Sequence, residues 1–304
     1  MTSAPDDIPF DRTMAAKPEE LQRVSPLVRR LVANNGGPFT FTGTCTYVVG
    51  RGEVAVIDPG PADASHVAAI MAAVAGETVR HILVTHTHRD HAPGAALLKA
   101  ATGAEVAGPP RRAARPDDPS LPALDAAFDL RYGPDRVLGE GDAVEGPGYR
   151  LVAVETPGHS SDHLAFALPA EDALFSGDHV MAWSTTVVAP PDGSMRAYMA
   201  SLRRLQGRDD AVYWPGHGGP VRNPRAFVKA LVLHRQMREG AILRRIAAGD
   251  ATVPALVASL YRDLAPSLRG AAGLSVLAHL VDLVADGQVA ADGPATLKAR
   301  YAAA

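Results

Sequence analysis

A run of six residues in this chain contains three histidines and one aspartate, and it follows closely on the apolar stretch 81–84. Three more residues of the same kinds stand later in the chain, each directly after a glycine. The complete set is His86, His88, Asp90, His91, His159, Asp178 and His217. Imidazole nitrogens and carboxylate oxygens are the usual protein ligands of zinc and related metals. Seven such ligands on four loops indicate a site for two metal ions, and the chemistry of such a site is metal-assisted hydrolysis.

The first metal is expected to have histidine ligands only. His86 and His88 stand at alternate positions, so both side chains can point inward from a tight loop after a strand. With His159 they offer three neutral nitrogens, a set that suits zinc and leaves a position open for solvent.

The second metal is expected to have harder ligands, namely Asp90, His91 and His217. Asp178 is the natural bridge, because its two carboxylate oxygens can touch both ions. We therefore predict two Zn²⁺ ions, with iron or manganese able to compete at the second site. Two such ions lower the pKa of a shared water, so a bridging hydroxide is the expected nucleophile. Asp90 and Asp178 are the predicted catalytic carboxylates.

Other residues are expected to support the ligands or to shape a substrate pocket. Asp58 ends a buried strand and is predicted to hold a ligand histidine by its second ring nitrogen. His163 is predicted to support the site from behind. The long proline-rich connection 109–134 is a candidate lid or substrate wall. The predicted pocket residues are His179, Trp183, Ser184, Thr185 and Tyr198.

The ligand loops fall between segments with the patterns of strands and helices. Two β-branched runs, 44–49 and 53–57, are joined by Gly-Arg-Gly and predict a hairpin. Helices are expected over 63–75 and 93–101. Further strands are expected over 105–107, 150–154, 163–168, 173–175 and 211–214. This alternation indicates helices packed on a sheet.

The end of the chain has a different character. Residues 1–223 are expected to form the catalytic domain, with 1–37 as an irregular lead-in, and 224–304 a second domain. Three helices are expected in that domain, over 224–248, 253–261 and 273–285. An Asp-Gly turn then separates two short extended runs, 288–291 and 296–301. Three helices followed by a small hairpin outline a winged helix.

Composition sets few limits on partners. The formal charge of −3 at pH 7 gives no general preference for nucleic acid or anionic membranes. The polar, acidic start lacks the pattern of a secretory signal, and no apolar run suggests a membrane span. The single cysteine, Cys45, is interpreted as a small buried strand residue. A cytoplasmic protein without a membrane partner is therefore expected, and a homodimer is left open.

The His-x-His-x-Asp-His run, with the later His159, Asp178 and His217, resembles the metallo-β-lactamase-fold superfamily of hydrolases over residues 39–220. The resemblance implies an αβ/βα sandwich, an α/β fold that some schemes class as α+β. The C-terminal segment is similar to the β-lactamase-like protein 2 group, whose members carry a winged helix; that similarity implies an endoribonuclease. Lactamases of the best-known subclass have a cysteine where Asp178 stands, which disfavours antibiotic hydrolysis as the main activity.

Three classes of function follow from these observations. The favoured one is hydrolysis of a small acyl substrate, a thioester or ester, with lactonase or weak β-lactamase activity as a variant of it. The second is cleavage of single-stranded RNA, since residues 225–304 contain ten Lys or Arg against six Asp or Glu. The third, a nucleic-acid-binding regulator without activity, is opposed by the intact ligand set. Scarce aromatic residues, 5% of the chain, favour the small substrate over RNA.

Overall fold

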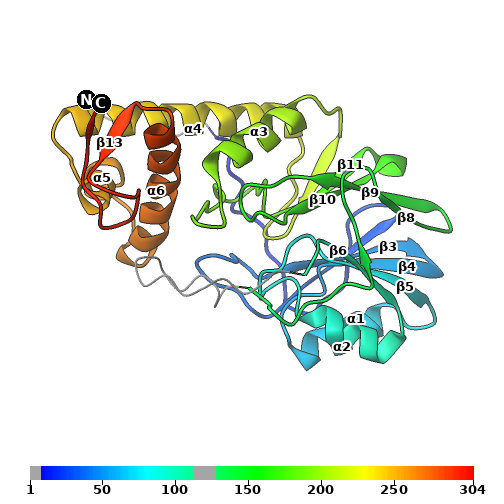
Figure 1. Ribbon diagram of the computed structural model, residues 1–304. Helices are drawn as coiled ribbons and strands as arrows, with labels where there is room; N and C mark the ends of the chain where they lie inside the picture. Colours follow the sequence, from blue (N-terminus) through cyan, green and yellow to red (C-terminus); the bar gives the residue numbers. More distant parts are fainter. Residues whose placement is uncertain (1–7, 112–127) are drawn as a thin grey trace.

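The computed structural model describes residues 8–111 and 128–304, and its main body is two β-sheets packed face to face with helices outside (Figure 1). One sheet has seven strands and the other has five. Helices α1 and α2 cover the outer face of the first sheet, and α3 and α4 cover the second. The αβ/βα sandwich that the resemblance implied is therefore confirmed.

The seven-stranded sheet follows the chain order. Its strands are β1 (Gln22–Arg23), β2 (Val28–Val32), β3 (Cys45–Arg51), β4 (Glu53–Ile57), β5 (Thr78–Leu83), β6 (Glu105–Gly108) and β7 (Arg136–Val137). The first four pair antiparallel, and the hairpin expected between the two β-branched runs is β3–β4. The strands β4 to β7 pair in parallel, with α1 (Ala64–Ala73) and α2 (Gly94–Thr102) as crossovers.

The five-stranded sheet has the order β12-β11-β10-β9-β8. Its strands are β8 (Ala143–Gly146), β9 (Tyr149–Glu155), β10 (Leu164–Leu168), β11 (Ala173–Gly177) and β12 (Val212–Pro215). A short 3₁₀ turn, Pro169–Glu171, links β10 to β11. Only β11 and β12 pair in parallel here, with α3 (Met195–Gln206) between them in the chain.

Strands buried on both faces explain the nearly continuous apolar runs in the sequence. In β10, Leu164 and Phe166 point into the core between the two sheets, whereas Ala165 and Ala167 point toward α3 and α4. Small residues on the helix side let the helices approach the sheet closely. Cys45 is fully buried in the core between the sheets, as predicted.

The C-terminal part forms a small core of its own. It contains α5 (Val253–Leu260), a 3₁₀ turn (Pro266–Leu268), α6 (Arg269–Ala285), and a hairpin of β13 (Val289–Ala291) and β14 (Tyr301–Ala303). The return strand begins at Tyr301, later than the run 296–301 had suggested. Within the described ranges, one helical segment is long and apolar enough to cross a membrane. It is Pro266–Ala285, the 3₁₀ turn together with α6, and half of its most apolar stretch is buried inside the protein.

Helix α4 (Pro224–Ala247) joins the two cores (Figure 1). Its first half packs Phe227, Val228 and Leu231 onto the five-stranded sheet and α3. Its second half packs Ile242 and Ile246 onto α5 and α6. One helix thus contributes to both cores, and a division of the chain at residue 223 stands as a proposal about domains.

We expect Leu231→Ala to lower the free energy of unfolding by about 2–5 kcal/mol. Leu231 is 1% exposed, and loss of its side chain would leave a cavity in the core that α4 shares with α3. Leu233→Ala on the same helix is the control, since Leu233 is 49% exposed and its loss should cost within about 0.5 kcal/mol. Urea unfolding measures both. Equal effects would show that this half of α4 is not part of the core.

Two elements differ from the sequence expectations. The lead-in 1–37 is not wholly irregular, because β2 lies inside the seven-stranded sheet beside β3. Arginines at 29 and 30 concealed this strand: Arg29 pairs with Glu77 at 2.5 Å, and Arg30 donates to the Gln22 side chain at 2.6 Å. Helix α3 was also not expected, although Ser194 caps its start.

Candidate metal centre

Four loops bring the seven predicted ligands together at one edge of the sandwich. The loop after β5 carries His86, His88, Asp90 and His91. The loops after β9, β11 and β12 carry the remaining three, which are His159, Asp178 and His217. Residues that are far apart in the chain thus face one point, because the strands that hold them end at the same edge.

The first three histidines converge through single nitrogen atoms. His88 Nδ1 lies 2.8 Å from His86 Nε2 and 3.0 Å from His159 Nε2. The three nitrogens form one of the groups in the described residues that are close enough to hold a metal ion. This triad matches the all-histidine set expected for the first metal.

The second group is built from a carboxylate and two histidines. His217 Nε2 lies 3.2 Å from Asp90 Oδ2 and 3.3 Å from His91 Nε2. The three atoms form a second compact group of potential ligands. The pairing matches the set expected for the second metal.

Asp178 lies between the two groups. Its Oδ2 is 3.4 Å from His217 Nε2 and 3.7 Å from His159 Nε2, and its Oδ1 is 3.5 Å from His91 Nε2. The Oδ1 atom is buried and has no hydrogen-bond partner among the described residues. A buried carboxylate oxygen without a donor is costly unless a cation binds it. Its position therefore fits a carboxylate that faces both metal sites.

The outer nitrogens of the histidines are held by the protein. His91 Nδ1 lies 2.9 Å from Asp58 Oδ2, and His86 Nδ1 lies 2.9 Å from Thr85 Oγ1. The Nδ1 atoms of His159 and His217 lie 2.8 Å and 3.3 Å from the carbonyl oxygens of Val187 and Gly43. A proton on each Nδ1 leaves the Nε2 lone pair free toward the cluster, the arrangement of metal-binding histidines. The donor set thus fits metal ions.

Two predicted supporting residues lie directly behind the cluster. Asp58 accepts hydrogen bonds from the backbone and the hydroxyl of Thr85, both at 2.8 Å, as well as contacting His91. His163 Nε2 accepts the backbone N–H of Asp178 at 3.1 Å, and its Nδ1 contacts the Thr156 hydroxyl at 2.8 Å. Sequence reasoning did not single out Asp162, which accepts the Thr87 hydroxyl at 2.6 Å and braces the histidine loop.

The electrostatics of the two groups differ. Burial and the neighbouring His159 lower the pKa of His88 to about 3, and burial holds the pKa of His86 well below its usual range. Burial also acts to lower the pKa of His217, but Asp178 and Asp90 outweigh it and raise the pKa to about 10. His86 and His88 of the first group therefore present neutral nitrogens, whereas the carboxylates give the second group a field that attracts cations.

Glycines before the later ligands permit the close packing of these loops. Gly158 has a φ of 145°, and a Cβ there would lie 2.3 Å from the backbone of Tyr198. A Cβ at Gly216 would lie 2.5 Å from Asp178 Oδ1. Each position excludes a side chain, the second because a ligand atom occupies the space.

A cavity of about 560 Å³, which we name the main cavity, opens over the cluster. Five of the predicted ligands line one side of it, and most of the remaining wall is apolar. The principal apolar side chains are Phe39, Phe128, Met181, Val187, Ala271 and Leu274. Ala271 and Leu274 belong to α6, so the C-terminal domain forms part of the wall. None of these six residues carried a signal in the sequence.

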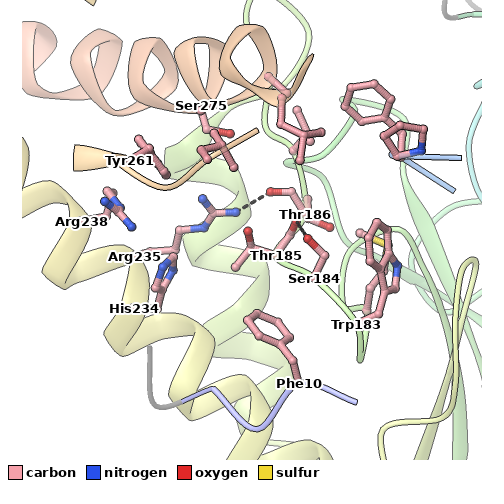
Figure 2. Close-up of a pocket in the computed structure, with 18 of the residues that line it drawn as sticks. Phe10, Trp183, Ser184, Thr185, Thr186, His234, Arg235, Arg238, Tyr261 and Ser275 are labelled. Carbon is pink, nitrogen blue, oxygen red and sulfur yellow. Dashed lines mark hydrogen bonds between the residues drawn. The ribbon is translucent and has the colours of Figure 1, made fainter. Parts of the chain in front are cut away.

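The predicted pocket residues divide into two sets. Trp183, Ser184 and Thr185 line a smaller cavity of about 300 Å³, which we name the side pocket (Figure 2). His179 and Tyr198 line neither cavity, and this part of the pocket prediction is corrected. Both side chains are fully buried, with their rings 4.6 Å apart, because α3 packs Tyr198 into the core behind the cluster.

The candidate lid over 109–134 falls largely outside the described residues, since 112–127 are not described. Its described end does reach the site. Phe128 lines the main cavity, and its ring lies 4.5 Å from the ring of His88.

Comparisons with known proteins agree with this architecture. Residues 39–217 match the Metallo-beta-lactamase superfamily, and residues 252–296 match the Beta-lactamase associated winged helix domain. A beta-lactamase domain protein from Burkholderia ambifaria has 23% sequence identity to this chain and superimposes with a TM-score of 0.79 over 96% of each chain. This likeness shows the fold, and the family matches confirm the predicted winged helix.

Named relatives include thioesterases. An atrochrysone carboxyl ACP thioesterase of Paecilomyces divaricatus is 33% identical over 210 residues, 67% of this chain and 59% of the relative. The corresponding Aspergillus fumigatus enzyme is 33% identical over 74% of this chain and 66% of its own length. This chain therefore spans about three fifths to two thirds of these two relatives.

A relative of the second predicted group covers more of the chain. The Beta-lactamase-like protein 2 homolog of Caenorhabditis elegans is 29% identical over 278 residues, 89% of this chain and 88% of the relative. With the superfamily match over more than half of the residues, these findings decide the family. The chain belongs to the metallo-beta-lactamase superfamily and is a hydrolase with a C-terminal winged helix domain.

Proposed function

We propose that this hydrolase cleaves an acyl thioester or a related ester with the help of two metal ions. The residues proposed to hold the first ion are His86, His88 and His159, and those for the second are Asp90, His91 and His217, with Asp178 between them. Zinc suits the nitrogen-rich first group, and iron or manganese is an alternative in the second. In the reaction, water adds to the acyl carbon and the C–S bond breaks, which yields a carboxylic acid and a thiol.

The observation that carries this proposal is the main cavity. It is about 560 Å³ in volume and mostly apolar, and the ligand cluster forms one of its sides. Apolar wall residues such as Phe39, Met181 and Leu274 suit an acyl chain, because transfer of its apolar surface out of water is favourable. Two named relatives are acyl ACP thioesterases, which supports the same reaction here.

Bound metal ions would supply a Lewis acid for the acyl oxygen and a water of lowered pKa. The chain's own residues orient this chemistry. Asp58 Oδ2 fixes the proton on His91 Nδ1, and the carbonyl of Val187 does the same for His159. These contacts hold the Nε2 atoms toward the cluster before substrate arrives.

The winged helix supports the small-substrate proposal over RNA cleavage. Its helix α6 places Ala271 and Leu274 in the wall of the main cavity. This packing is expected of a domain that closes a substrate cavity. An RNA strand would instead require an open basic path with aromatic side chains for its bases.

A substrate panel tests the proposal. The metal-loaded protein is incubated separately with acyl thioesters, lactones, a chromogenic lactam and single-stranded RNA. We expect thioester hydrolysis to have the highest kcat/KM. Cleavage of RNA without turnover of any thioester would replace the proposal by the endoribonuclease alternative.

We further expect Leu274→Trp to lower kcat/KM about tenfold for a long acyl chain and much less for an acetyl group. The indole ring of tryptophan is larger than the leucine side chain and would fill part of the main cavity. Val281→Trp is the control, since Val281 lies on the same helix and is 37% exposed. The kinetics of a chain-length series provide the measurement. An equal loss for both acyl lengths would show that the chain does not occupy this cavity.

A further inference from the structure

The side pocket adjoins the main cavity. Phe39, Met181, Val187 and Ala271 line both cavities, so a bound molecule can extend from the ligand cluster into the side pocket. The side pocket lies between α4, α6 and the segment 183–187 (Figure 2). Its residues therefore lie where the part of a substrate beyond the reacting bond would be placed.

Three arginines line the side pocket, namely Arg12, Arg235 and Arg238, and its described lining residues include no Asp or Glu. Arg235 is 3% exposed, and its guanidinium donates to the carbonyl of Thr186 at 2.5 Å (Figure 2). Its Nε is buried without a hydrogen-bond partner. Such a set of cations without carboxylates is suited to an anion.

Arg238 is held in a similar way. It donates to the carbonyl of Leu260 at 3.2 Å, and its guanidinium lies 4.2 Å from the centre of the Tyr261 ring. Its Nε is also buried without a partner. The contacts leave other N–H groups of both arginines available to a ligand.

The acidic residue next to Arg238 in α4 does not form an ion pair with Arg235 or Arg238. Glu239 follows Arg238 in α4, but its carboxylate contacts His279 Nδ1 at 3.4 Å. In the described ranges, no carboxylate forms an ion pair with Arg235 or Arg238. A buried guanidinium without a counter-charge is unfavourable, and a bound anion would relieve that cost.

We propose that the side pocket binds the phosphate on the thiol arm of an acyl thioester, that is, a phosphopantetheine group. The inference rests on the proposed thioester hydrolysis, which places the acyl chain in the main cavity and leaves the thiol arm to extend toward the arginines. Guanidinium groups match phosphate oxygens with paired hydrogen bonds. The hydroxyls of Thr185 and Ser275 lie in the same pocket as further donors.

A pair of acyl thioesters that differ only in the phosphate of the thiol arm tests this inference. Hydrolysis of acyl-4′-phosphopantetheine is compared with that of acyl-pantetheine. We expect kcat/KM to be about tenfold or more higher for the phosphorylated ester, and Arg238→Ala to remove most of this preference. Arg12→Ala is a second variant, in case Arg238→Ala folds poorly. Arg225→Ala is the control: it removes an exposed arginine of the same helix whose partner is Asp209, and the preference should survive.

The phosphate has two natural sources, coenzyme A and an acyl carrier protein. The same acyl group on coenzyme A and on a phosphopantetheinylated carrier protein identifies the source by the higher kcat/KM. In either case Arg238→Ala should lower that value about tenfold. Equal rates for the phosphorylated and phosphate-free esters, unaffected by Arg238→Ala, would overturn the inference and leave the thioesterase proposal intact.

Binding separates the inference from the proposed function. Calorimetry with 4′-phosphopantetheine and with pantetheine requires no turnover. Tighter binding of the phosphorylated compound, lost in Arg238→Ala, supports the pocket even if neither ester is hydrolysed. Arg238-dependent binding of a single-stranded RNA oligonucleotide, with no binding of 4′-phosphopantetheine, would assign the arginines to nucleic acid and overturn the inference.

Discussion

Replacement of Asp178 by asparagine is expected to lower hydrolysis by about 10³-fold, equivalent to roughly 4 kcal/mol in the barrier. Its two carboxylate oxygens lie within 3.4–3.7 Å of histidines from both ligand groups. Asparagine keeps the shape of the side chain but loses the charge and one of the two oxygen ligands. The variant should also bind one metal ion or none, where the natural chain is expected to bind close to two.

Metal analysis of the purified protein and steady-state kinetics on the same samples measure both effects. Asp209→Asn serves as the matched control, because its carboxylate is 92% exposed and lies outside the cluster. Urea unfolding of both variants separates loss of the site from loss of the fold. Two ions per chain in Asp178→Asn, with normal turnover, would exclude the proposed bridge. A natural chain that binds no metal would exclude the mechanism as a whole.

Asp58→Asn is expected to lower activity or metal affinity by about 10- to 100-fold, although Asp58 is not a proposed ligand. Its Oδ2 holds the proton on His91 Nδ1 at 2.9 Å and also accepts the Thr85 hydroxyl at 2.8 Å. Asparagine has only one side-chain oxygen, so it cannot accept hydrogen bonds from Thr85 and His91 with both terminal atoms. The imidazole of His91 is then expected to lose its fixed orientation. The carboxylate charge that increases the basicity of His91 is also lost.

The backbone at Asp58 makes asparagine the appropriate replacement. Its φ is 50°, a region that asparagine tolerates better than most residues. Asp172→Asn is a matched control, because Asp172 has a φ of 45° and lies on an exposed turn between β10 and β11. Metal titration followed by kinetics measures the effect. If Asp58→Asn matched the Asp172→Asn control, Asp58 would be a turn residue without a role at the site.

The fold was predictable wherever a residue pattern reported burial directly. The hairpin β3–β4 and the strands before the ligand loops have apolar or β-branched runs, because both faces of each sheet are covered. The strand β2 was missed because Arg29 and Arg30 interrupt its apolar pattern. The charge of Arg29 is balanced by Glu77, which lies far along the chain, and Arg30 donates a hydrogen bond to the neutral side chain of Gln22 on the paired strand β1. A local pattern cannot show partners of that kind.

The positions of the seven candidate ligands followed from residue types and spacing alone, because a strand that ends in histidine or aspartate places that side chain at the sheet edge. The substrate cavities did not follow from spacing. Tyr198 and His179 stand close to Asp178 in sequence, yet the packing of α3 buries both behind the cluster. Leu274 is nearly a hundred residues away from Asp178, yet α6 brings it to the cavity wall.

The sequence by itself determined the superfamily, the class of hydrolases and the seven candidate metal ligands, since these depend on ligand type and on loops next to strands. The tertiary structure decided what surrounds that cluster. Helix α4 contributes to the cores of both domains. Helix α6 supplies part of the wall of the apolar main cavity, and α4 and α6 together line the side pocket with its arginines. A cavity is the space left between packed elements, so its shape and charge depend on contacts between distant segments that no local pattern contains.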